Sequence, residues 1–149
     1  MKYSKKVICH FKEEFDFSSV ETTLLPNDFR VIERSKLAMK FAGRGMNSTK
    51  ENPVRGATEI ALKAENKALH LNAKLGGVVK LSLFICLFPP LLILLMTFFS
   101  SEESEVINYL WVWFVIGPVM TFWLYRRTIH SLDTLLDNAV TMQPLDKLS

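Results

Sequence analysis

Residues 78–127 decide the fold, and they read VVKLSLFICLFPPLLILLMTFFSSEESEVINYLWVWFVIGPVMTFWLYRR. Two apolar runs, at 81–99 and 106–125, flank an acidic break at 100–105. Neither run contains a charged side chain. Each is close to the ~20 residues that a helix, rising 1.5 Å per residue, needs to cross roughly 30 Å of hydrocarbon. The stretch is therefore typical of a transmembrane helical hairpin, with spans at about 79–99 and 106–125.

Basic residues flank this hairpin on one side only. Lys74 and Lys80 precede the first run, Arg126 and Arg127 follow the second, and the acidic break holds only glutamates as charged residues. Because cytoplasmic loops are enriched in Lys and Arg, we expect the acidic break to form an outer loop and both termini to lie in the cytoplasm. The first apolar run begins far from the N-terminus, so we expect no cleavable signal peptide. The predicted location is the inner (plasma) membrane of a bacterium.

The sequence before the hairpin is basic. Residues 1–80 carry 15 Lys and Arg against 9 Asp and Glu, whereas residues 126–149 carry equal numbers of each. A short link to the first span would hold this basic part against the inner leaflet, where each nearby Lys or Arg is worth about 1 kcal/mol of attraction to anionic lipids. The candidate contacts with anionic head groups or an acidic partner are Arg44, Lys50, Arg55, Lys74, Lys80, Arg126 and Arg127. For the first three, ordinary surface composition favours the alternative of a solvated connecting loop.

Residues 1–77 are long enough for one small domain, which we expect to be cytosolic and rich in β-strands. Over residues 3–17 the apolar side chains fall mainly on odd positions, a period of two that predicts a strand, with a break near 13–14. A basic amphipathic helix on the membrane surface would need apolar residues three and four apart. Residues 18–28 combine turn-forming residues with an ambiguous segment, so their state stays open, and residues 29–41 again have the composition of a strand.

A β-hairpin is the prediction for residues 58–75, with Asn66 and Lys67 as a two-residue turn. In this register three apolar pairs meet on one face, namely Ala64 with Leu69, Leu62 with Leu71, and Ile60 with Ala73. The opposite face pairs Glu59 with Lys74 and Lys63 with His70. Asn suits the positive φ of a type I′ turn, although Lys stands where Gly is preferred. The alternative is one helix over residues 57–75, which the alanines favour.

Prolines and a glycine interrupt both apolar runs near their centres. The four residues are Pro89, Pro90, Gly117 and Pro118. A proline inside a helix removes one N–H donor and crowds the preceding turn, so these residues are candidates for a hinge or for a packing notch where another helix docks. The alternative is that Pro and Gly are simply commoner in membrane helices. The spans lack charged residues, which argues against a proton relay or an ion-coupled transporter.

Residues 128–149 predict a cytosolic amphipathic helix followed by a tail. The apolar stripe consists of Ile129, Leu132, Leu136 and Val140, with Leu135 and Ala139 beside it. It could pack on the N-terminal sheet, on a second copy or on the membrane. The sheet is the simplest choice, because an apolar sheet face needs cover.

Motifs for chemistry are not found in the sequence. The three histidines are scattered, with no Cys or carboxylate at the spacing of metal ligands. The Gly-rich segment at 43–53 lacks the spacing of a phosphate-binding loop, and no serine or cysteine sits in a nucleophile motif. Cys9 and Cys86 lie in different elements, so we expect no disulfide between them. We therefore predict no catalytic residue, no metal and no cofactor. The basic charge of residues 1–80 is already explained by a position against the membrane, so we predict no nucleic-acid partner.

The combined prediction is an α+β membrane protein with three parts. A small antiparallel β domain at 1–77 precedes a transmembrane hairpin at 78–127, whose second helix extends into the cytoplasm at 128–149. The expected function is that of a non-enzymatic accessory, regulatory or assembly protein that binds a protein partner or itself. We expect a homo-oligomer or a subunit of a membrane complex. The alternative is an oligomerising, membrane-active effector or pore-forming subunit.

Overall fold

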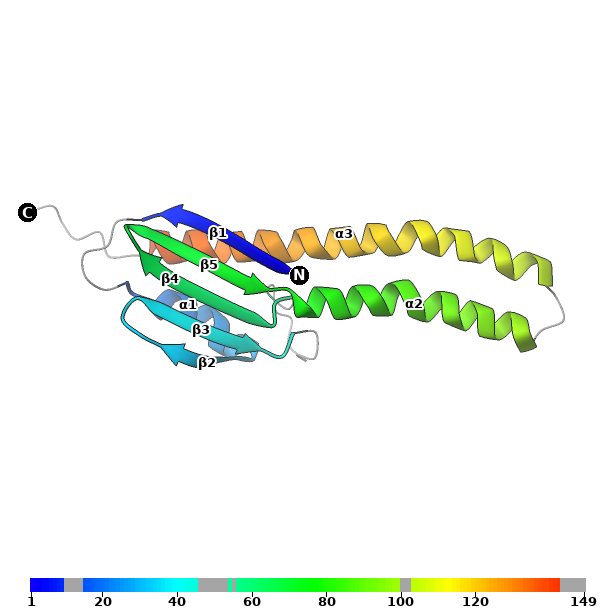
Figure 1. Cartoon of the computed structure of the whole chain (residues 1–149), viewed down its shortest axis with the longest axis horizontal. Helices are drawn as coiled ribbons and strands as arrows, with labels where there is room; N and C mark the ends of the chain where they lie inside the picture. Colours follow the sequence, from blue (N-terminus) through cyan, green and yellow to red (C-terminus); the bar gives the residue numbers. More distant parts are fainter. Residues whose placement is uncertain (10–14, 46–53, 55, 100–102, 143–149) are drawn as a thin grey trace, which may run out of the picture.

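The computed structural model describes residues 1–9, 15–45, 54, 56–99 and 103–142. Their elements in chain order are β1 (Lys2–Ile8), α1 (Ser18–Leu24), a 3-10 turn η1 (Leu25–Asn27), β2 (Phe29–Arg34), β3 (Ala38–Gly43), β4 (Glu59–Glu65), β5 (Ala68–Lys74), α2 (Gly76–Phe99) and α3 (Glu103–Thr141). The strands form one antiparallel sheet in the order β1-β5-β4-β3-β2. Figure 1 shows α2 leaving one end of this sheet and α3 running back along the whole molecule. The predicted antiparallel β domain followed by helices is confirmed.

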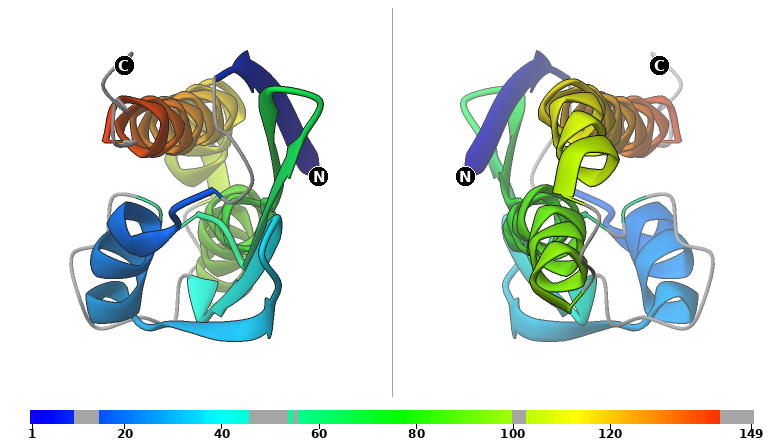
Figure 2. Two further views of the ribbon diagram at one scale, coloured as in Figure 1. Left: turned by 90° about the vertical axis from the view of Figure 1, so that its left-hand side faces the viewer. Right: turned by 90° about the vertical axis from the view of Figure 1, so that its right-hand side faces the viewer.

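Two helical segments cover one face of the sheet. Figure 2 shows α1 and the end of α3 on the same side, and no described helix covers the opposite face. The α3 residues 128–141, which we call the sheet half, bury Leu132, Leu135, Leu136 and Ala139. They join the buried strand residues in a single core. The expectation that the apolar stripe packs on the chain's own sheet is therefore confirmed.

The predicted β4–β5 hairpin is confirmed in its register. Ile60 lies opposite Ala73 and Leu62 opposite Leu71, while Glu59 lies opposite Lys74. The turn residues Asn66 and Lys67 have φ values of 52° and 55°. These positive values fit a type I′ turn, and Lys67 adopts one without glycine. The alternative of one helix over this segment is wrong.

The prediction of a single strand over residues 3–17 is wrong in its second part. Strand β1 ends at Ile8, and Phe15 to Phe17 belong to no strand. The Asp16 carboxylate accepts hydrogen bonds from the Ser18 N–H at 2.9 Å and from the Ser18 hydroxyl at 2.8 Å. This local bonding favours the start of a helix, so tertiary burial of the two phenylalanines imitates strand periodicity. The predicted break at 13–14 lies outside the described residues.

The segments between β1 and β4 also differ from a simple strand pattern. Residues 18–27, whose state the sequence left open, form α1 and η1. The strand predicted at 29–41 is two strands, β2 and β3. Between them the Ser35 N–H donates to the Ala38 carbonyl at 2.8 Å, and the Ala38 N–H donates to Ser35 Oγ. A serine that bonds locally in this way makes the turn, although no Gly or Pro marks it.

A tightly packed group of glycines, which we call the glycine junction, joins the sheet to the helices. It consists of Gly45, Gly56, Gly76 and Gly77. The Gly56 carbonyl accepts from the N–H groups of Gly77 and Val78 at 3.1 and 3.2 Å. A Cβ on Gly56 would collide with Thr128 of α3 and with Val78 of α2. The start of α2, the 56–58 segment and the middle of α3 are therefore held together with no spare space.

Beyond the junction α2 and α3 pack against each other. Gly117 is buried, and a Cβ there would lie 3.3 Å from Cys86 Sγ. Among the described residues one helix, Gly76–Phe98, is long and apolar enough to cross a membrane. The second predicted span does not meet this criterion over the part of α3 that was tested, so the two-helix transmembrane hairpin is not confirmed.

Candidate functional site

The predicted basic contacts lie around the glycine junction. Arg44 follows β3, Lys74 ends β5, Lys80 is in the second turn of α2, and Arg126 and Arg127 precede Thr128 in α3. All five are exposed. Because Gly56 contacts both α2 and Thr128, these chain positions meet at the same end of the sheet (Figure 1). Lys50 and Arg55, the other two predicted contacts, lie outside the described residues.

Lys74 already has a partner within the sheet. Its Nζ lies 2.5 Å from Glu59, and Lys40 Nζ lies 2.8 Å from the other oxygen of the same carboxylate. Hydrogen bonds from Lys40 and Lys74 hold the pKa of Glu59 below its ordinary value. The charge of Lys74 is thus partly neutralised, so it is a weaker candidate for a lipid contact than Lys80, Arg126 or Arg127.

Arg127 marks a boundary along α3. Its guanidinium carbon lies 5.4 Å from the centroid of the Trp123 ring. Such a cation over an indole face is attractive, and Trp beside Arg is typical of the lipid–water interface. On the N-terminal side of this pair α3 presents apolar side chains, and on the C-terminal side it covers the sheet.

Both helices expose large apolar side chains along the segment beyond the junction. On α2 these include Leu83, Leu87, Leu91, Leu95 and Phe98. On the α3 residues 110–125, which we call the hairpin half, they include Trp111, Phe114, Val115, Val119 and Phe122. Soluble monomers rarely expose apolar patches larger than a few hundred Å². Such a surface is typical of contacts with lipid or with another protein.

The interrupting residues occupy different surroundings. Gly117 allows close approach of α2 and α3 at Cys86. Pro89, Pro90 and Pro118 lie inside helices that continue on both sides, and Pro118 is exposed. A hinge or docking notch at these four residues stays a prediction.

A polar contact that sequence reasoning missed ties the sheet half of α3 to β1. The Tyr3 hydroxyl donates to Asp133 Oδ1 at 2.5 Å, and Lys5 Nζ lies 3.0 Å from the same oxygen. Burial, followed by this hydrogen bond, raises the pKa of Tyr3 above its ordinary range. The partners are 130 residues apart. No local motif could have signalled them.

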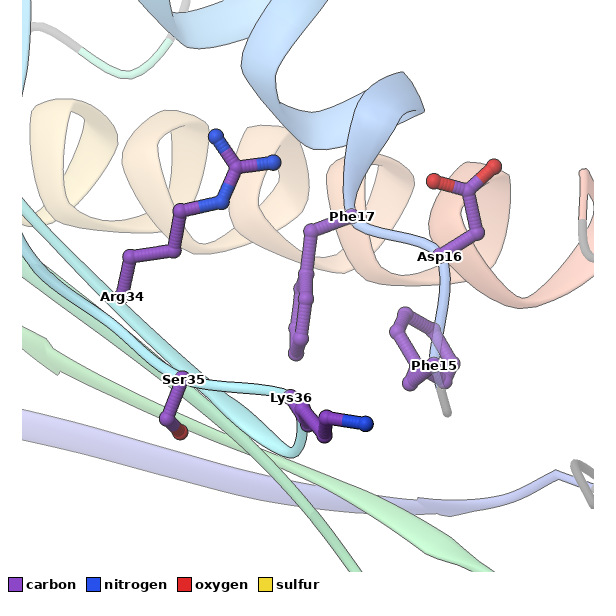
Figure 3. A pocket seen from close by; sticks show the side chains of 6 residues that line it. All are labelled: Phe15, Asp16, Phe17, Arg34, Ser35 and Lys36. Carbon is purple, nitrogen blue, oxygen red and sulfur yellow. The ribbon is translucent and has the colours of Figure 1, made fainter. Parts of the chain in front are cut away.

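A pocket of about 560 Å³ was also missed. It lies between the segment before α1 and the β2–β3 turn, and it is lined by Phe15, Asp16, Phe17, Arg34, Ser35 and Lys36. Figure 3 shows the two phenylalanine rings on the Lys36 side and the Asp16 carboxylate turned away. No local signal in the sequence could have revealed it, because the fold brings residues 15–17 against residues 34–36.

Within the described ranges, no three His, Cys, Asp or Glu residues are grouped so that they could hold a metal ion. Cys9 is buried in the core and Cys86 is exposed on α2, and both are free thiols. Comparison with protein-family models, with curated proteins and with solved structures gives no match.

Proposed function

We propose that this chain is a non-enzymatic integral membrane accessory protein, whose β domain is held rigidly on a two-helix membrane hairpin and binds a protein partner in the cytoplasm. One observation carries the proposal. Helix α3 is continuous over 39 residues, and it packs on α2 in its hairpin half and on the sheet in its sheet half. The same element would thus serve as membrane span and as core helix.

The apolar surface supports insertion of both helices. Burying one Leu or Phe side chain is worth about 1.5–3 kcal/mol, so leaving two helices of such side chains in water would cost tens of kcal/mol. Leu91, Phe98 and Trp111 are 63, 87 and 72% exposed. With its polar backbone groups satisfied internally, a helix pair is a form that lipid tolerates.

The charges support the orientation. Lys80, Arg126 and Arg127 stand at the junction, where the apolar surface begins. Basic residues at this level favour the cytoplasmic side and anionic lipids. The β domain would then lie directly against the inner leaflet.

Rigid attachment supports a binding role. The glycine junction leaves no flexible linker between β5 and α2, because Gly76 is already the first residue of the helix. A domain fixed in this way presents a defined surface to a partner at the membrane.

Native mass spectrometry of the detergent-extracted protein tests the proposal. We expect a stable complex with a second protein or a defined oligomer, together with no dye leakage from liposomes that contain the purified chain. Leakage at low protein-to-lipid ratio would overturn the accessory function and support the pore-forming alternative.

Topology needs a separate measurement. In a Cys86→Ser background, a Ser101→Cys variant should react with a membrane-impermeant maleimide added to intact cells. A Lys67→Cys variant should react only after the membrane is opened. Equal labelling of both positions in intact cells would rule out the proposed orientation.

A further inference from the structure

Strand β1 forms one border of the sheet. It is first in the strand order, so within the described part of the chain no strand pairs with its outer side. Figure 2 shows β1 at this border, next to α3. The Leu75 N–H donates to the Met1 carbonyl at 3.0 Å, and the Cys9 N–H donates to the Lys67 carbonyl at 3.1 Å. Because bonding alternates along an antiparallel ladder, odd-numbered residues of β1 bond to β5, and the N–H and C=O groups of residues 2, 4, 6 and 8 point outward.

The side chains of the same even-numbered residues lie on the open face of the sheet. They are Lys2, Ser4, Lys6 and Ile8, and all four are exposed, Ile8 to 73%. The odd-numbered side chains of β1 point to the other face, toward α3. A strand that bonded to the outward backbone groups would therefore place its own side chains beside the two lysines.

The charge available on the open side of this border is positive. Strands β1 and β5 contain no Asp or Glu. On β4, Glu59 already lies between two lysines, and Glu65 lies 2.6 Å from Lys63. Neither Lys2 nor Lys6 forms an ion pair with another described residue. Two cations four residues apart are thus available to an added strand.

The side of β1 that faces α3 selects different side chains. Tyr3 and Val7 are half-buried at the margin of the core, as is Tyr125 of α3. The cation on this side, Lys5, is already bound to Asp133 at 3.0 Å. Apolar side chains placed here would leave water by lying beside Tyr3 and Val7. A carboxylate would instead meet Asp133, so this side favours apolar residues.

We propose that the outer border of β1 binds an extended segment of a cytoplasmic partner. The segment pairs antiparallel with β1, carries two carboxylates four residues apart that face Lys6 and Lys2, and places apolar side chains on the side of α3. Extended peptides add to sheet edges in this way, since backbone hydrogen bonds give affinity and alternate side chains give specificity. This inference rests on the proposed function, because it names the class of partner.

Two other occupants fit this border poorly. Antiparallel pairing of two β1 strands would bring the lysines of both copies together, and lysines on an edge oppose such self-pairing. It also needs a two-fold axis normal to the sheet, which would point the two membrane hairpins in opposite directions. For a nucleic acid, the open side of β1 and β5 carries no Phe, Tyr or Trp on which bases would stack.

The test measures peptide binding to the full chain in nanodiscs of neutral phosphatidylcholine. The probe is the fluorescein-labelled octapeptide Thr-Glu-Val-Thr-Val-Glu-Val-Thr, and fluorescence anisotropy reports its binding. Paired antiparallel about Ser4, its two Glu residues face Lys6 and Lys2. We expect binding about fivefold tighter than that of the same peptide with Gln in place of Glu. The permuted peptide Thr-Glu-Val-Thr-Glu-Val-Val-Thr has the same composition, but its Glu residues lie on opposite sides of a strand, and it should bind as weakly as the Gln peptide.

Variants of the protein locate the site. Lys2→Gln with Lys6→Gln should remove the preference for Glu over Gln. The control Arg30→Gln alters the same open face at the other border of the sheet, and it should change affinity less than about twofold. Lys2→Glu with Lys6→Glu should prefer the peptide with Lys in place of Glu. This reversal distinguishes a changed site from an unfolded protein.

A change in the peptide backbone tests strand addition itself. The N–H of the middle Thr would bond to Ser4, so its N-methylation should weaken binding about tenfold. The N–H of the next Val points away from β1, and its N-methylation should have less than about a twofold effect.

Several results would overturn the proposal: equal binding of the Glu, Gln and permuted peptides, an unchanged preference in the double Gln variant, or equal effects of the two N-methyl groups. Displacement of the peptide by phosphatidylglycerol in the nanodisc would assign the lysines to lipid, and displacement by single-stranded RNA would assign them to nucleic acid. None of these results depends on the complexes seen by mass spectrometry, so the two proposals can fail separately.

Discussion

The hairpin half and the sheet half of α3 are both rich in apolar residues, yet their side chains have opposite exposure. Leu132 and Leu136 are fully buried, whereas Phe114 and Phe122 are 69 and 62% exposed. The difference lies in what each half faces. The sheet half faces strands that alternate apolar and polar side chains, whereas α2 is the one described element beside the hairpin half. Apolar content alone does not determine burial, and the proposed membrane insertion would account for the exposed half.

The largest expected loss of stability comes from shortening one apolar side chain in the sheet half, compared with shortening one in the hairpin half. Leu136→Ala should lower the free energy of unfolding by about 2–5 kcal/mol, because it leaves a cavity in the core. Phe114→Ala removes a larger side chain but should cost about 0.5 kcal/mol, since no protein cavity forms. Urea titration of the detergent-solubilised protein, followed by circular dichroism, gives both values. If the two variants lose similar amounts of unfolding free energy, the hairpin half is packed in protein as the sheet half is.

The next prediction concerns the joint between the halves. Gly56→Ala places a methyl group against Thr128 and Val78, and such overpacking should cost about 1–3 kcal/mol. Adding Thr128→Ala should recover part of this loss, because it removes the contacting hydroxyl and methyl groups. The same unfolding assay measures the pair. If the double variant is no more stable than Gly56→Ala alone, the junction is not limited by this contact.

A smaller loss of stability should follow from removing the hydrogen bond that joins β1 to the sheet half of α3. Tyr3→Phe removes the hydrogen bond to Asp133 and should cost about 1–2 kcal/mol at pH 8. The folded protein raises the pKa of Tyr3, so this stabilisation is present below the ordinary tyrosine pKa of about 10 and is lost as pH rises above it. The difference in unfolding free energy between wild type and Tyr3→Phe should be smaller at pH 11 than at pH 8. A constant gap would mean that the hydroxyl does not couple to folding.

The smallest effect belongs to the open face of the sheet, which neither half of α3 touches. Glu59→Gln should cost less than about 1 kcal/mol, as expected for a partly exposed ion pair. Because the pKa of Glu59 is lowered, its stabilisation is present above the ordinary glutamate pKa of about 4.3 and is lost as pH falls below it. Glu65→Gln, which breaks a single and more exposed pair with Lys63, should cost less. A larger loss for Glu65→Gln at pH 7 would contradict this order.

Sequence reasoning succeeded where the determining interactions are local. The β4–β5 register follows from apolar pairs and turn residues within 18 positions, and the sheet half of α3 follows from its helical stripe. It failed for Phe15 and Phe17, because burial under a tertiary contact imitates the period of a strand. The Arg34 pocket and the Tyr3–Asp133 contact could not be predicted, because each joins segments that only the fold brings together.

The unbroken length of α3 has a mechanical consequence. At 1.5 Å per residue its 39 residues extend for about 58 Å. Membrane helices adjust to a thinner bilayer by tilting. With α3 in the proposed position, a tilt of about 10° would displace its far end sideways by about 10 Å and carry the attached sheet with it. A change in bilayer thickness would then change the position of the β domain relative to the inner leaflet.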